Sequence, residues 1–319
     1  MRILITGARG FVGSHLREAL LRVCGSDVEL IATAKEPGDS LFGKMMPLDV
    51  TDRAAVETAF QCHCPTHVIH LAGIAAPSAA NSNSREAWQV HLTGTLNLAK
   101  TILARNPDCW LLHVSSALVY GDSAKPGLPL DEAALLAPMD EYAASKAAAD
   151  LALGALTHRG LKCVRFRPFN HSGPGQAEGF VLPDCAMQIA KIEAGLVPPL
   201  MRVGNVGVER DFLDVRDVVS AYALAARKAA SLEPGVIFNI ASGVPRRIGD
   251  ILERMLRQSE AKIIVEQDPE RLHSNDLPRV VGNADRARGC MAWSPERRFE
   301  DTVDEVLNDW RARIAARNC

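Results

Sequence analysis

The sequence predicts an α/β protein with a doubly wound parallel sheet and a smaller, discontinuous C-terminal domain. Short apolar runs alternate with longer segments of helical spacing through the first half of the chain. The runs are continuous rather than alternating, as expected of strands that helices cover on both faces. After Arg167 this rhythm ends, and prolines and glycines interrupt short, irregular segments. That change indicates a second region.

Composition and charge restrict the class of protein. The 319 residues suit two domains or one large α/β unit. Hydrophobic residues make up 47% and charged residues 23%, which is typical of a globular chain and not of a coiled coil or a disordered one. The formal net charge is −2, from 36 Lys and Arg against 38 Asp and Glu. We therefore expect neither nucleic acid nor a membrane as a partner.

The expected strands and helices follow one another along the chain. The strands are apolar runs: Arg2–Thr6, Val28–Thr33, Lys44–Leu48, His67–Ala72, Trp110–Ser115 and Leu161–Arg167. The helices between them have Leu, Ala and Val at helical spacing: Gly13–Val23, Arg53–Cys62, Arg85–Arg105 and Glu141–His158. Asp217–Ala230 is expected as a further helix and Val236–Ile240 as a further strand, so the chain returns to the first domain.

A glycine-rich turn follows the first strand and opens the first helix. Glycine lets a backbone turn tightly and approach a pyrophosphate, and a helix N-terminus offers free N–H groups at the positive end of its dipole. The alternative is a purely structural turn. The strand–turn–helix context favours dinucleotide binding. The residues of the turn are Gly7, Arg9, Gly10, Phe11, Val12 and Gly13.

The domain boundaries follow from these patterns. Residues 1–167, together with about 212–243, are expected to form the dinucleotide-binding domain. Residues from about 168 to 211, together with 244–319, are expected to form the substrate domain.

Two cations favour NADP(H) as the cofactor, with NAD(H) as the alternative. No acidic residue ends the second strand, where a carboxylate would bind the adenosine ribose. Arg9 and Lys35 lie near that point, and a ribose 2′-phosphate would be attracted by them. The alternative is that both simply face solvent. The residues expected to border the rest of the cofactor are Asp49, Val50, Leu71, Ala72 and Gly73.

A serine, a tyrosine and a lysine form the candidate catalytic set. Ser115 and Ser116 end the fifth strand, and Tyr142 precedes Lys146 by four residues on the next helix. That spacing places both side chains on one helix face, where an ammonium would lower the pKa of a phenol toward neutrality. The alternative is a solvated Tyr and Lys on an ordinary helix. The strand ends favour catalysis, because ligands bind there in such sheets.

Taken together in order, these motifs resemble the extended short-chain dehydrogenase/reductase family: TGARGFVG, LDV, HLAG, SSALVYG, YAASK, RPFNHSGPGQ and RDFLDVRDVV. The resemblance implies a Rossmann fold. It also implies that Ser116 rather than Ser115 is catalytic, that Tyr142 is the acid/base, and that Lys146 also binds the nicotinamide ribose.

The resemblance extends to the substrate. It implies that Phe169 borders the nicotinamide, together with its neighbours from Pro168 to His171, and that Asn170 and Arg210 contact the diphosphate. His171 is accordingly a candidate for both ligands. His91 departs from the family pattern because it stands where an Asn is usual, and His273 stands where an Arg is usual. The roles of these two histidines stay open.

Residues next to the motifs narrow the reaction. In the family that the chain resembles, enzymes that remove water have an acidic residue directly after the catalytic Ser or Thr; Ala117 and Leu118 follow Ser116 here and cannot move a proton, which disfavours dehydration. Members that epimerise C3 and C5 use a Cys/His pair, and Gly175 rather than His follows Pro174 here, which disfavours that reaction. Within the family, residues 167–193 resemble enzymes that reduce GDP-6-deoxy-4-keto-D-mannose at C4 to GDP-D-rhamnose. The alternative enzyme is a nucleotide-sugar 4-epimerase with tightly held NAD. A non-catalytic dinucleotide sensor is a third interpretation, which the catalytic set disfavours.

Cysteines and apolar runs bear on location and assembly. Eight cysteines without framework spacing, no signal peptide and no membrane span predict a cytoplasmic protein. Cys62-His63-Cys64 lacks a second ligand pair at zinc spacing, so no metal is expected. The small residues Ala144, Ala147 and Ala148 permit the close helix packing of a homodimer, although a core-facing stripe explains them as well.

Overall fold

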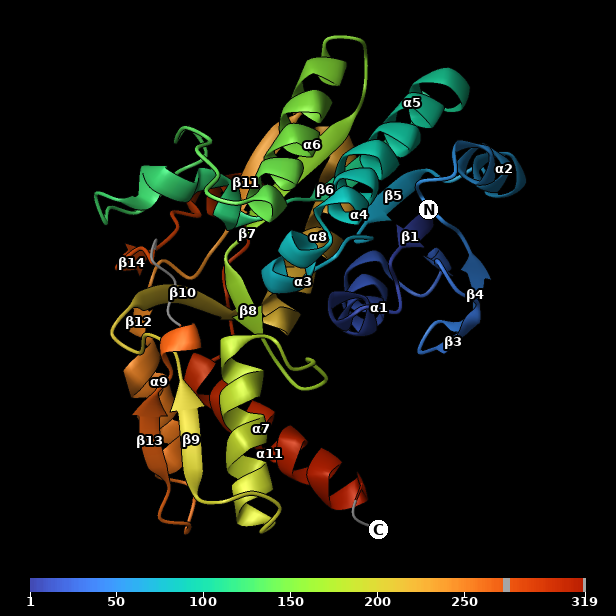
Figure 1. Cartoon of the computed structure of the whole chain (residues 1–319). Coiled ribbons are helices and arrows are strands. Elements are labelled where there is room, and N and C mark those ends of the chain that lie inside the picture. The colour runs from blue at the N-terminus through green and yellow to red at the C-terminus, as the bar shows by residue number, and fades with distance from the viewer. Residues whose placement is uncertain (272–275, 318–319) are drawn as a thin grey trace.

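A computed structural model of the chain describes residues 1–271 and 276–317. Its larger part is an eight-stranded sheet in the order β11-β7-β6-β5-β1-β2-β4-β3, in which every neighbouring pair is parallel except β3–β4 (Figure 1). The strands are β1 (Arg2–Thr6), β2 (Glu29–Ala34), β3 (Gly38–Ser40), β4 (Gly43–Pro47), β5 (His67–His70), β6 (Trp110–Val114), β7 (Cys163–Pro168) and β11 (Val236–Ile240). The predicted doubly wound α/β fold is confirmed.

Helices cover both faces of this sheet and explain its continuous apolar strands. Along β1, Ile3 and Ile5 belong to the core under one helix layer and Leu4 to the core under the other. The first layer contains α1 (Phe11–Cys24), α8 (Val215–Lys228) and α10 (Asp285–Met291), and the second contains α2 (Arg53–His63), α5 (Thr95–Arg105) and α6 (Glu141–Thr157). Successive residues of a strand point to opposite faces, so a strand covered on both sides must be apolar throughout.

One expected helix is interrupted. In place of a single helix over Arg85–Arg105, the structure has α4 (Ser84–Trp88), a π-helical segment η1 (Gln89–Gly94) and then α5. Short α3 (Pro77–Ser82) precedes them. A π-helical turn holds an extra residue and is frequent at functional sites. Apolar spacing does not reveal such a turn, because the helix continues on both sides of it.

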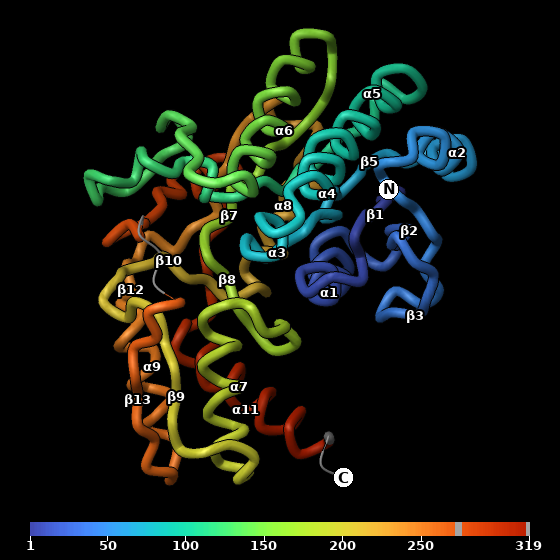
Figure 2. Tube along the Cα trace, viewed as in Figure 1, coloured from blue at the N-terminus to red at the C-terminus, as the bar shows by residue number. Residues whose placement is uncertain are grey.

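The smaller part has its own core and lies below the large sheet in the views of Figures 1 and 2. Figure 2 follows the chain from β7 through β8 into α7, where it passes from one part to the other. The elements are β8 (Asn170–Ser172), α7 (Val181–Glu193), β9 (Leu200–Val203), β10 (Glu209–Asp214), β12 (Pro245–Arg247), α9 (Ile248–Leu256), β13 (Ile264–Gln267), β14 (Arg279–Val280) and α11 (Phe299–Arg317). Strand β10 pairs with β8, β12 and β14, and β9 pairs with β13.

Short 3-10 helices complete the chain: η2 (Ala117–Ala124), η3 (Ala229–Ser231) and η4 (Pro269–Arg271). Within residues 1–271 and 276–317, no helix has both the length and the apolar character that a bilayer span requires.

The chain returns to the large sheet more than once after Arg167. Val236–Ile240 is a strand of the large sheet, as the sequence predicts, and it pairs with β7. The division at residue 244 departs from the structure in one segment, because α10 packs on α8 and β11, and Trp293 lies in the core of the large sheet. The Trp293 indole N–H donates to the carbonyl of Asp217 at 3.0 Å. The two-domain division otherwise stays a prediction.

Candidate active site

The glycine turn brings the ends of β1 and β5 together. Gly7 has φ +68°, and a Cβ built there would lie 2.7 Å from the backbone N of Ala72. Only glycine fits such a close approach in that conformation. Gly10 is the N-cap of α1 and offers no side chain to its free N–H groups. The predicted cofactor residues at this edge of the sheet are Gly7, Gly10, Phe11, Val12, Gly13, Leu71, Ala72 and Gly73.

The two cations expected near an adenosine ribose differ in their surroundings. Arg9 is exposed, with Nη1 3.7 Å from the position of a Cβ on Gly38, and it has no carboxylate partner among the described residues. The Lys35 ammonium instead lies 3.8 Å from Asp49 and 3.7 Å from Glu86. Arg9 is therefore the better placed of the two to bind an added phosphate.

Val50, which follows β4, packs against Gly94 of the π-helical segment η1. Val50 is buried, and a Cβ at Gly94 would lie 2.6 Å from its Cγ2. Its apolar side chain is thus used largely in packing against η1.

Ser116 rather than Ser115 lies beside Tyr142. Ser116 is the N-cap of η2, and its Oγ accepts the N–H of Leu118 at 3.2 Å. Ser115 is buried, and its hydroxyl is directed to the backbone carbonyl of Lys146 at 3.5 Å. Because its oxygen accepts from the backbone, the Ser116 hydroxyl is free to donate to another group.

Tyr142 lies in the first turn of α6. Asp140 caps this helix by accepting the N–H of Ala143 at 2.7 Å, and Asn81 Oδ1 accepts the N–H of Tyr142 at 2.9 Å. Burial raises the pKa of Tyr142 to about 12; a hydrogen bond with Ser116 acts against this rise, and the charge of Asp140 adds to it. The phenol is therefore protonated at neutral pH.

Lys146 follows one turn later and points toward β6. Its ammonium donates to the carbonyl of Val114 at 3.1 Å, and burial lowers its pKa to about 8. The expectation that Lys146 lowers the pKa of Tyr142 toward neutrality is wrong for this structure. The reason is that burial disfavours the phenolate of Tyr142.

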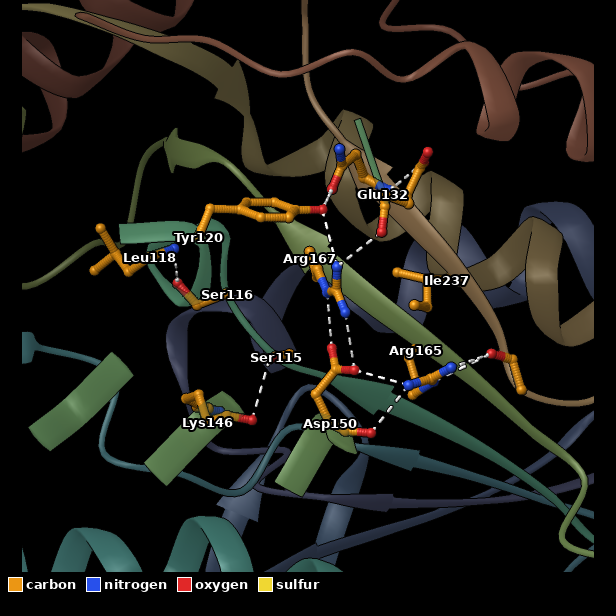
Figure 3. Close-up of polar contacts among 12 residues, drawn as sticks. Ser115, Ser116, Leu118, Tyr120, Glu132, Lys146, Asp150, Arg165, Arg167 and Ile237 are labelled. Atoms are coloured by element: carbon orange, nitrogen blue, oxygen red, sulfur yellow. Dashed lines mark hydrogen bonds and ion pairs between the residues drawn. The ribbon is translucent and has the colours of Figure 1, made fainter. Parts of the chain in front are cut away.

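A buried polar network anchors α6 to β7 (Figure 3). Asp150 accepts from Arg167 Nε at 2.8 Å and from Arg165 Nη1 at 2.9 Å. Arg167 also donates to the Tyr120 hydroxyl at 3.1 Å, which donates to Asn239 at 2.7 Å. Sequence reasoning missed this network. Its signal was the spacing of Asp150, four residues after Lys146 and thus on the same helix face.

The residues expected near the nicotinamide and sugar lie at the start of the smaller part. Phe169 is buried, and its ring packs against Gly282, so its side chain belongs to the core. Asn170 on β8 is exposed. The His171 ring stacks on Phe11 with centroids 6.4 Å apart, and its Nδ1 lies 2.9 Å from the carbonyl of Phe169. His171 therefore touches the glycine turn directly.

Arg210 lies on β10, two residues before Phe212, which pairs with Asn170 on β8. Its guanidinium donates to Asp276 at 2.9 Å and to the carbonyl of Leu277 at 2.7 Å. Sequence reasoning did not include Asp276. His273 lies outside the described residues.

Comparisons with known proteins point to one family. A model of the NAD dependent epimerase/dehydratase family matches residues 3–241. The chain is 34% identical over 319 residues to a GDP-6-deoxy-D-mannose reductase of Pseudomonas aeruginosa, covering 98% of each chain.

Solved structures agree. A structure from P. aeruginosa described as RMD complexed with NADPH has a TM-score of 0.85 and 31% identity, covering 98% of this chain and 99% of that one. A Thermus thermophilus UDP-glucose 4-epimerase in complex with NAD has a TM-score of 0.82 and 28% identity, covering 98% and 99%.

Proposed function

Since the chain belongs to the NAD-dependent epimerase/dehydratase family, we propose that it is an NAD(P)-dependent nucleotide-sugar reductase. Its proposed substrate is a nucleotide-linked 6-deoxy-4-keto hexose, specifically GDP-6-deoxy-4-keto-D-mannose, reduced at C4 to GDP-D-rhamnose. The likeness to a GDP-6-deoxy-D-mannose reductase supports a mannose-derived sugar and guanine as the nucleotide base of the proposed substrate. The observation that carries the proposal is the position of Ser116 beside Tyr142, with Lys146 one turn later on the same helix.

The glycine turn fits a dinucleotide. A Cβ at Gly7 would meet the backbone of Ala72, and the N-terminus of α1 carries no side-chain cap, so backbone can approach a pyrophosphate there. When bound, the reduced nicotinamide supplies a hydride to the C4 ketone. Arg9 supports NADPH over NADH, because its guanidinium lies beside β3 without a carboxylate partner in the described part of the chain.

Three side chains have separate roles in the proposed reduction. Ser116 donates a hydrogen bond to the ketone oxygen and polarises the carbonyl. Tyr142 transfers its phenolic proton to that oxygen, which its raised pKa permits because the phenol is protonated at neutral pH. Lys146 holds the nicotinamide ribose and contributes positive charge beside the phenol when it is protonated. Asn170, His171 and Arg210 are proposed to bind the sugar diphosphate.

A nucleotide-sugar 4-epimerase is the second candidate, favoured by the likeness to the T. thermophilus UDP-glucose 4-epimerase. Such an enzyme needs Tyr142 as base and then as acid, with a cofactor that stays bound. The same Ser116, Tyr142 and Lys146 would serve both reactions, so tight retention of NAD is what would distinguish the epimerase.

A panel of substrates separates these candidates. The purified protein is incubated with GDP-, dTDP- and UDP-linked 4-keto-6-deoxy sugars and either NADPH or NADH, and nicotinamide absorbance is followed. We expect NADPH to be consumed faster with the GDP-linked mannose derivative than with any other sugar of the panel. Faster reduction of a dTDP- or UDP-linked sugar contradicts the base assignment. Purified protein carrying NAD, together with conversion of UDP-glucose, contradicts the reductase.

A second copy of the chain is the proposed partner, in the cytosol. On α6 the exposed Leu151 follows the half-buried Ala144 and Ala148 at helical spacing, whereas Ala147 is buried. These apolar residues would support close helix packing between two copies. Free cysteines in the described part fit a reducing compartment. Sedimentation equilibrium of wild type and Leu151→Glu tests the dimer: a monomeric wild type contradicts it.

A further inference from the structure

A histidine within the π-helical segment contacts the catalytic helix. His91 is buried, and the carbonyl of His91 accepts the Thr95 hydroxyl at 2.5 Å where η1 passes into α5. The extra residue of the π turn changes the direction in which its side chains point relative to α5. The imidazole lies against α6, edge-to-face on the Tyr142 ring, with centroids 5.6 Å apart and planes at 88°.

Hydrogen bonds define the tautomer of this ring. The backbone N–H of Ile74 donates to His91 Nε2 at 3.0 Å, so the proton of a neutral ring lies on Nδ1. Nδ1 then donates to Ser145 Oγ at 2.8 Å. The Ser145 hydroxyl in turn donates to the backbone carbonyl of Tyr142 at 2.8 Å. A chain of three hydrogen bonds thus runs from the end of β5 to the backbone of the proposed acid.

The same ring borders Lys146. A Cβ built on Gly73 would lie 3.2 Å from His91 Cδ2 and 3.3 Å from Lys146 Nζ. The imidazole and the ammonium therefore both lie close to the backbone of Gly73, where the cofactor is expected to cross the sheet. The ring fills space that water would otherwise occupy beside both proposed catalytic groups.

The ring is held neutral by its surroundings. Burial, and then the charge of Lys146, lower the pKa of His91 to about 3. The other titratable groups around it are Tyr142 on α6, His70 on β5 and His113 on β6. Burial also lowers the pKa of His70 to about 3, and that of His113 well below its ordinary value. No positive charge is therefore added next to Lys146 at neutral pH.

We propose that His91 is a positioning residue that orients Tyr142 through Ser145, packs against the phenol ring and excludes water from Tyr142 and Lys146. The inference rests on the proposed function, because it takes these two residues as the acid and its neighbour. In the structure the His91 ring contacts Ile74, Ser145 and the ring of Tyr142. It acts on the proton transfer only through the residues of α6.

Replacing the ring by a methyl group tests the proposal. In His91→Ala water reaches both groups, so the pKa of Tyr142 falls toward its ordinary value and that of Lys146 rises toward its own. Reduction needs a protonated Tyr142, so the alkaline limb of the pH profile of kcat moves to lower pH. The value of kcat falls by up to about 10²-fold through misplacement of the acid, while KM for NADPH changes little.

Matched variants separate this role from a general loss of structure. His158→Ala removes an exposed histidine at the C-terminal end of α6, the helix that carries Tyr142, and is expected to keep the wild-type profile. His91→Asn keeps an amide N–H for Ser145 and is expected to recover part of kcat, and Ser145→Ala removes the link to Tyr142. If His91→Ala does not fold, as judged by circular dichroism and NADPH binding, the pH profile of kcat is measured for His91→Asn and Ser145→Ala instead.

A spectroscopic readout keeps the inference independent of the substrate. The chain has 3 tyrosines, so ultraviolet difference absorbance of tyrosinate, with Tyr142→Phe subtracted, isolates the ionisation of Tyr142. The expected result is ionisation at lower pH in His91→Ala than in wild type. Identical ionisation overturns the inference even if the reductase is active. An inactive wild type on every sugar contradicts the proposed function and leaves this readout intact.

Discussion

Burial and hydrogen bonding act in opposite directions on Tyr142. Burial disfavours its phenolate, while the hydroxyl of Ser116 beside it favours the charged form, and burial is the larger effect. The result is a phenol that keeps its proton at neutral pH. A group in this state can donate a proton to an alkoxide as it forms, which is what reduction of a ketone requires.

Replacing Tyr142 by Phe therefore removes most of the turnover. The expected loss in kcat is on the order of 10²–10⁴-fold, as for other general acids, with little change in cofactor affinity measured by fluorescence titration. Tyr222→Phe is the matched control, because the Tyr222 hydroxyl is buried without a hydrogen-bond partner among the described residues. A Tyr142→Phe enzyme with the wild-type rate would remove Tyr142 from the mechanism.

Replacing Arg9 by Ala weakens binding of NADPH more than binding of NADH. Only NADPH carries the 2′-phosphate, and one charge-assisted contact contributes roughly 1.5–3 kcal/mol, or about tenfold or more in Kd. Arg17→Ala changes another exposed arginine of the same region and should leave the ratio of the two Kd values unchanged. Equal losses for both cofactors in Arg9→Ala would show that Arg9 does not contact the 2′ position.

Helix α6 shows how a single element brings the site together. Tyr142, Lys146 and Asp150 are spaced by four residues, so each turn contributes one side chain to the same face. Asp150 is fully buried and holds Arg165 and Arg167 of β7. The helix that carries the proposed acid is thereby fixed to the strand that leads to the substrate residues.

Replacing Asp150 by Asn destabilises the protein, because the change leaves two arginines without their buried counter-charge. Losing one partner of a buried ion pair costs about 3–5 kcal/mol of unfolding free energy, measurable by urea titration. Asp108→Asn breaks an exposed pair with Lys162 and is the control, expected to change little. Equal effects of the two substitutions would contradict a structural role for the buried network.

The sequence predicts elements better than it predicts contacts. The spacing of Tyr142 and Lys146 is visible in the sequence because a helix repeats locally. The π-helical turn at His91 and the pairing of Lys35 with Asp49 are not visible, since each depends on segments that meet only in the folded chain. For the same reason the sequence does not show that burial controls the pKa of Tyr142.

At the scale of the whole molecule, the candidate site lies where the two parts of the structure meet. The His15 ring on α1 lies 2.9 Å from the carbonyl of Pro174, and Arg313 on α11 donates to the carbonyl of Gln176 at 3.0 Å. The segment after β7 is thus held from both sides. The large sheet was predictable except for its edge strand β3, because the other strands are apolar runs, whereas β3 consists of Gly, Asp and Ser. The packing of Trp293 in the core of that sheet was not predictable, because a single aromatic residue forms no periodic apolar pattern in the sequence.

Hydride transfer from a deuterated cofactor distinguishes a reductase from an epimerase. The protein is incubated with GDP-6-deoxy-4-keto-D-mannose and NADPH deuterated at the transferred position of the nicotinamide, and the product is examined by proton NMR. We expect GDP-D-rhamnose with deuterium at C4 and one NADPH consumed for each sugar formed. Product without deuterium at C4, or reduction of no more than one sugar per protein molecule without net consumption of the added NADPH, would contradict the proposed reduction, because an epimerase transfers only the hydride of the cofactor that it keeps bound.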